Sequence, residues 1–168
     1  MAEDAGLAPN PEWAAIAKGG ANWFYWIAGL SLINSAAFAF GADFHFLAGL
    51  GLTELVNGII SVVIEQGASI ALWSVSIIFG IFLVVGFALA GYYANGFSRT
   101  AFLIGIVVYI FDGLLVLLLG DYFMAGFHAF ALIFIIRGYL ACRRIKAFVN
   151  VPSSVPNASV TPLQNTES

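Results

Sequence analysis

The decisive stretch of this sequence runs from Thr100 to Cys142 and reads TAFLIGIVVYIFDGLLVLLLGDYFMAGFHAFALIFIIRGYLAC. It contains two apolar segments, 100–120 and 122–142, and each reaches the roughly 20 residues that a helix needs to cross a bilayer. Only Asp121 separates them, so the two helices are expected to pack as an antiparallel hairpin, with Asp121 placed to cap the second helix. The stretch therefore predicts a helical hairpin inside a membrane.

The composition of the whole chain agrees with this. Of its 168 residues, 61% are hydrophobic and 9% are charged, and the mean hydropathy is +0.97. Soluble domains carry a charge on about a quarter of their residues, so a water-soluble fold could not cover this much apolar surface. We expect the lipid bilayer of the plasma membrane to surround the protein, and we expect no nucleic-acid partner.

Two further apolar segments, 22–41 and 69–95, are also long enough to cross a bilayer. The predicted fold class is an all-α integral membrane protein with four transmembrane helices in an antiparallel bundle. A single transmembrane domain is expected over residues 22–146. A cytoplasmic segment, 1–21, precedes it, and a polar tail without periodicity, 147–168, follows and is expected to be disordered.

The N-terminal segment is expected to contain a short surface helix. Asn10 reads as its cap, Pro11 as its first residue and Glu12 as a first-turn acid. Gly19 and Gly20 predict a hinge between this helix and the first span.

A fifth apolar segment, 44–65, differs from the others because its second half is amphipathic. At about 100° per residue, four polar residues share one narrow arc: Glu54, Asn57, Ser61 and Glu65. If this segment crossed the membrane, Glu54 would lie near the bilayer centre, where a carboxylate costs about 2.5–3.5 kcal/mol on insertion scales. We therefore expect an outer-side amphipathic or re-entrant segment. The alternative is a protein with five spans.

The positive charges predict the orientation. With four spans, one side of the membrane holds five cationic residues: Lys18, Arg99, Arg143, Arg144 and Lys146. Because cytoplasmic loops are enriched in lysine and arginine, we expect both termini to be cytoplasmic. The basic side chains near the end of the last span are expected to contact lipid headgroups: Arg137, Arg143, Arg144 and Lys146.

Several polar residues fall where lipid should exclude them. The candidate intramembrane site consists of five of these: Asp112, His128, Asn34, Tyr109 and Glu54. At about 1.5 Å of rise per residue, Asn34, Asp112 and His128 lie at one level in the outer half of the membrane. A single inward-facing polar layer follows if these faces converge, with Glu54 as its roof.

Two interpretations of this layer remain open. An ionisable residue inside a membrane is by default a candidate functional site, and Asp112 beside His128 would hold a shared proton, as a proton relay requires. Alternatively, Asp112 and Asn34 form hydrogen bonds between helices and fix the packing, at about 0.6 kcal/mol per contact.

Motifs of nucleophilic catalysis, nucleotide binding and metal binding are absent from the sequence. His45 and His128 are the only histidines and Cys142 is the only cysteine, so we expect neither a metal site nor a cofactor. The residues favour a protein that is not an enzyme.

Four short segments carry a resemblance to other proteins: Gly20-Ala-Asn-Trp-Phe-Tyr-Trp, Phe111-Asp-Gly, Asp121-Tyr-Phe and Gly126-Phe-His128. They resemble segments of uncharacterised small four-helix bacterial integral membrane proteins. This resemblance implies no activity, and no functional residue is carried over from it.

The leading functional hypothesis is a non-enzymatic subunit of a larger membrane complex or a self-associating helical module. The alternatives are a small proton or ion transport protein that uses Asp112 and His128, and a membrane-embedded enzyme.

Overall fold

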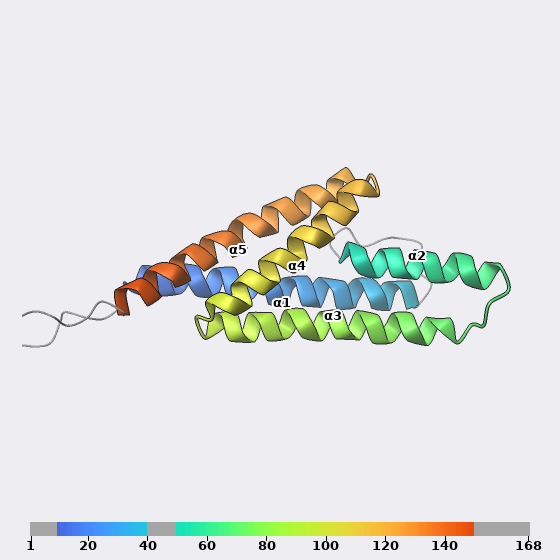
Figure 1. Ribbon diagram of the computed structural model, residues 1–168, viewed down its shortest axis with the longest axis horizontal. Helices are drawn as coiled ribbons and strands as arrows, with labels where there is room; N and C mark the ends of the chain where they lie inside the picture. The colour runs from blue at the N-terminus through green and yellow to red at the C-terminus, as the bar shows by residue number, and fades with distance from the viewer. Residues whose placement is uncertain (1–9, 40–49, 150–168) are drawn as a thin grey trace, which may run out of the picture.

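A computed structural model describes residues 10–39 and 50–149 of the chain. These residues form helices and connecting turns, without a strand, in agreement with the predicted all-α class. The helices are α1 (Pro11–Ala39), α2 (Gly51–Glu65), α3 (Leu72–Asn95), α4 (Arg99–Leu118) and α5 (Tyr122–Val149) (Figure 1).

Three of these helices are long enough and apolar enough to cross a membrane: α3, α4 and α5. Their outward faces carry many exposed isoleucine, leucine, valine and phenylalanine side chains, a surface that suits hydrocarbon rather than water. Helix α1 is long enough as well, but it carries Asn22 and Asn34 within the predicted span. Its membrane crossing stays a prediction.

The connections place the ends of the helices as the charge pattern predicts. The start of α1, the α3–α4 turn and the end of α5 lie at one end of the molecule (Figure 1). Two contacts hold these segments together. The Arg99 guanidinium donates to the Arg143 carbonyl oxygen at 2.8 Å, and the Arg144 guanidinium lies 6.0 Å from the ring centroid of Trp13. The basic residues are therefore gathered at this end.

The helix boundaries differ from the sequence predictions in two places. Helix α1 begins as expected, because the Glu12 amide donates to the Asn10 side-chain oxygen at 2.9 Å. It then continues through Gly19 and Gly20, so the predicted hinge is wrong. At the other terminus, α5 continues to Val149, into the predicted tail, since basic residues favour a helix C-terminus and do not end it. The rest of the tail lies outside the described residues.

Gly20 has a packing role where α1 crosses α5. A Cβ atom on Gly20 would lie 2.6 Å from the Cα atom of Gly138, so the two backbones meet without side chains between them. Small residues that allow such close approach are common between helices in membranes. The glycines that suggested flexibility instead fix a tight helix crossing.

Replacing Gly138 with alanine is expected to lower the free energy of unfolding by about 1–3 kcal/mol, because overpacked helix contacts force the backbones apart. Thermal unfolding in detergent micelles measures this. The control is Gly86→Ala on α3, where an added Cβ meets no atom within 4 Å. Equal stability of the two variants would contradict the tight crossing.

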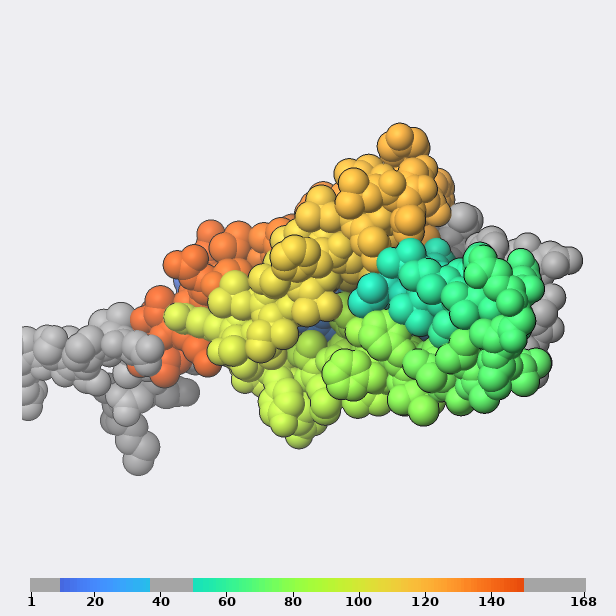
Figure 2. Space-filling model, turned by 45° about the vertical axis from the view of Figure 1, so that its right-hand side comes forward, coloured from blue at the N-terminus to red at the C-terminus, as the bar shows by residue number. Residues whose placement is uncertain are grey.

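Helix α2 is shorter than the others and begins near the middle of the molecule. From there it runs outward beside α3, with α4 on its other side (Figures 1 and 2). Its 15 residues span only ~22 Å, less than the ~30 Å of a bilayer core. Its polar residues Glu54 and Asn57 bond to α1 and α3, whereas Ile59 and Val62 are more than half exposed. The polar face of α2 therefore points into the bundle, and its apolar face points outward.

Candidate functional site

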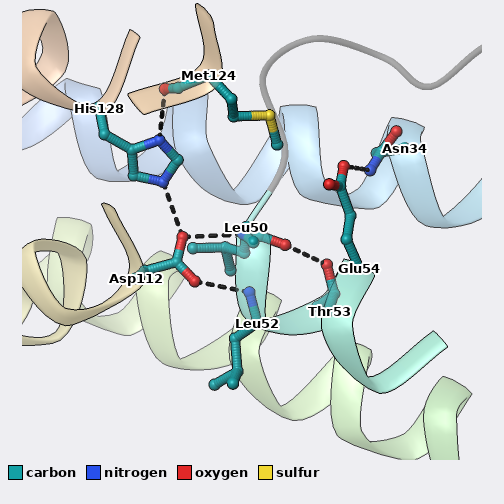
Figure 3. A network of polar contacts seen from close by, with 9 residues as sticks. Asn34, Leu50, Leu52, Thr53, Glu54, Asp112, Met124 and His128 are labelled. Atoms are coloured by element: carbon teal, nitrogen blue, oxygen red, sulfur yellow. Dashed lines mark hydrogen bonds and ion pairs between the residues drawn. The ribbon is translucent and has the colours of Figure 1, made fainter. Parts of the chain in front are cut away.

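The carboxylate of Asp112 receives the start of α2. Its Oδ2 atom accepts the Gly51 amide at 3.0 Å, and its Oδ1 atom accepts the Leu52 amide at 2.8 Å (Figure 3). The first amides of a helix have no partner within the helix, and α2 lacks a side-chain cap of its own at Leu50. Asp112 therefore caps α2 from another helix.

Glycine at position 51 makes this capping possible. A Cβ atom there would lie 2.0 Å from a methyl carbon of Val116, one turn beyond Asp112 on α4. Any larger residue would hold the start of α2 away from the carboxylate. The turn is also closed from within, because the Thr53 hydroxyl donates to the Leu50 carbonyl oxygen at 2.6 Å.

His128, on α5, is the third hydrogen-bond partner of Asp112. Its Nε2 atom lies 2.8 Å from Asp112 Oδ2, and its Nδ1 atom lies 2.9 Å from the carbonyl oxygen of Met124 (Figure 3). Both side chains are buried, with 1% exposure for His128 and 5% for Asp112.

The two contacts of the imidazole restrict where its protons can lie. A carbonyl oxygen only accepts, so Nδ1 carries a hydrogen. The contact between Nε2 and Oδ2 needs one further proton, bound to either atom. Either the imidazole donates this proton to the carboxylate, or a protonated carboxyl group donates it to the imidazole.

Tyr109 covers one face of the imidazole. The two rings stack with centroids 4.5 Å apart and an interplanar angle of 20°, and Phe87 meets Tyr109 edge-on at 6.0 Å. Gly113 leaves room for this stack, because a Cβ atom there would lie 3.1 Å from the Cβ of His128. The ring therefore has a single orientation, set by Tyr109, Gly113 and its two hydrogen bonds.

Glu54 and Asn34 are hydrogen-bonded to each other. The Asn34 amide nitrogen donates to Glu54 Oε1 at 2.9 Å, between α1 and the first turn of α2 (Figure 3). The structure thus brings Asp112, His128 and Tyr109 into one cluster and places Asn34 beside Glu54. That these residues form one layer at a common depth in the membrane stays a prediction.

No protein-family model, curated protein or solved structure matches this chain.

Sequence reasoning missed the backbone amides of Gly51 and Leu52. Amide groups carry no signature of residue type, so the sequence names the acceptor but not its donors. The sequence does show that α2 begins in Leu50-Gly51-Leu52, where Leu50 has no side chain that could cap the helix. A helix start of that kind needs an acceptor from elsewhere if it is buried.

The basic residues near the end of α5 are exposed: Arg137, Arg143, Arg144 and Lys146. Tyr139 lies under the Arg143 guanidinium, with 6.0 Å between the charge centre and the ring centroid. Contact with lipid headgroups stays a prediction. Within residues 10–39 and 50–149, three or more metal-ligating side chains do not gather in one place. His45 lies outside these residues.

Proposed function

We propose that this chain is a four-span integral membrane protein of the plasma membrane, with cytoplasmic termini and a re-entrant α2 on the outer side. The gathering of Lys18, Arg99, Arg143 and the other basic residues at one end supports the orientation. The short length of α2 and its inward polar face support the re-entrant segment.

Within this arrangement, the Asp112 cluster has a structural role. The observation that carries this proposal is that Asp112 bonds to the Gly51 amide, the Leu52 amide and the His128 ring at once. A carboxyl group offers about four hydrogen-bonding positions, so three of them are occupied by groups of the same chain. Two cavities on the surface of the bundle are lined by other residues. The cluster thus holds α2 in place, and the protein acts as a non-enzymatic helical module.

A module of this kind acts through association with itself or with a larger membrane complex. We expect the exposed apolar face of α2 and the basic end of α5 to form the contacts. Mass measurement of the protein in lipid nanodiscs tests this: we expect a particle that contains a second copy or a co-purifying subunit. A single copy without a partner would contradict the association.

A second candidate function is proton conduction, favoured by the buried contact of 2.8 Å between His128 Nε2 and Asp112 Oδ2. Proton flux into liposomes distinguishes the two functions. A structural cluster predicts the same background flux for the wild-type protein, for Asp112→Asn and for empty liposomes. Flux that requires Asp112, in a variant that remains folded, would establish the relay instead.

A further inference from the structure

A cavity of about 520 Å³ lies between α1, α2 and α3, and its lining does not include Asp112, His128 or Tyr109. Its walls are mostly apolar and include Leu32, Ile77 and Ile81. These three side chains are also 54%, 56% and 53% exposed, so the cavity opens at the outer surface of the bundle. In a membrane, which this inference takes from the proposed function, that opening faces lipid.

One part of the cavity is polar. The Ser76 hydroxyl donates to the side-chain oxygen of Asn57, which leaves the amide nitrogen of Asn57 as a donor. Among the described residues, neither this nitrogen nor the Ser35 hydroxyl has a hydrogen-bond partner. The cavity therefore offers an unused amide donor and a hydroxyl beside apolar walls.

The described residues that line the cavity are all uncharged. A charged group that entered it would lose its hydration without meeting an opposite charge, which is costly in an apolar environment. A neutral head group with hydroxyl or ester oxygens meets no such penalty, and its oxygens can accept from Asn57. The volume lies within the roughly 300–1,000 Å³ of typical ligand pockets.

We infer that this cavity binds a neutral lipid of the monoacylglycerol class, which enters sideways from the bilayer. Its ester and hydroxyl oxygens bond to Asn57 and Ser35, and its acyl chain lies along Ile77 and Ile81. Asp112 does not line this cavity, so a negative result for lipid binding would leave the proposed role of Asp112 in the bundle unchanged.

The test uses monoolein as the probe and native mass spectrometry of the full-length protein as the readout. We expect one monoolein per chain, and at least tenfold weaker binding of oleate, which has the same chain but a carboxylate head. Asn57→Ala is expected to weaken the binding of monoolein about tenfold, since one good hydrogen bond is lost. Equal binding of oleate and monoolein would overturn the assignment of the head group.

Two glycines of α3 provide matched variants for the position of the site. Gly80 lines the cavity, and a Cβ atom there would meet the Ser35 hydroxyl at an ordinary 3.7 Å, so Gly80→Leu fills the space. Gly86→Leu adds the same side chain where no atom lies within 4 Å. Circular dichroism reports whether both variants fold. We expect Gly80→Leu to bind monoolein at least tenfold more weakly than the wild type. Gly86→Leu is expected to bind it as the wild type does.

If both leucine variants bind like the wild type, or if the wild-type protein binds no monoolein, the inference is wrong. The comparison of oleate and monoolein on the wild-type protein does not depend on the folding of any variant.

Discussion

Replacing Asp112 with alanine is expected to lower the free energy of unfolding by about 3 kcal/mol, as when one partner of a buried polar network is removed. The substitution leaves the Gly51 and Leu52 amides and the imidazole of His128 without their hydrogen-bond partner in an apolar interior. Asp112→Asn should fall between alanine and the wild type. Its oxygen still accepts one amide, but its NH2 group faces the other donor amide.

Thermal unfolding in detergent micelles measures both variants. The control is Asp121→Ala, because Asp121 also caps a helix, with its carboxylate accepting the Met124 amide at 2.9 Å, but is exposed to solvent. A cap of that kind is worth about 1 kcal/mol. If Asp112→Ala costs no more stability than Asp121→Ala, then Asp112 does not hold α2 in the bundle.

Replacing Gly51 with alanine is expected to cost about 1–3 kcal/mol, because the added methyl group overlaps Val116 and pushes the start of α2 from Asp112. Val116→Ala should remove the obstruction. The double variant Gly51→Ala/Val116→Ala is therefore expected to be more stable than the sum of the two single effects predicts, by about 1 kcal/mol or more.

The free energies of unfolding of the four proteins form a double-mutant cycle. Its control pairs Gly51→Ala with Val75→Ala. Val75 is exposed on α3, and its atoms are not among the nearest neighbours of a Cβ at position 51. That second pair should be additive. Strict additivity in both cycles would show that the contact between Gly51 and Val116 does not position α2.

The meeting of Asp112 and His128 follows from the sequence because both lie on one tight hairpin. Asp112 stands nine residues before Asp121 and His128 seven residues after it, so antiparallel helices bring them to the same depth. The cap of Asp121 on α5 is predictable for a related reason, since it needs only a local side chain. Contacts fixed by a short connection are readable from residue spacing.

Contacts that depend on the placement of α2 are not readable in this way. The arc of Glu54 and Asn57 predicts which face of α2 is polar, but not that this face meets Asn34 and Ser76. The predicted hinge at Gly20 is wrong for the same reason. Glycine permits both a hinge and a close crossing, and only Gly138, more than a hundred residues away, decides between them.

We propose that the Asp112 carboxyl group holds the first turn of α2 inside the bundle. Hydrogen exchange of the Gly51 and Leu52 amides, followed by NMR in lipid nanodiscs, tests it most directly. We predict slow exchange of both amides in the wild-type protein and at least tenfold faster exchange of both in Asp112→Ala, with the amides of α4 unchanged. Equal exchange at Gly51 and Leu52 in the two proteins would contradict the claim.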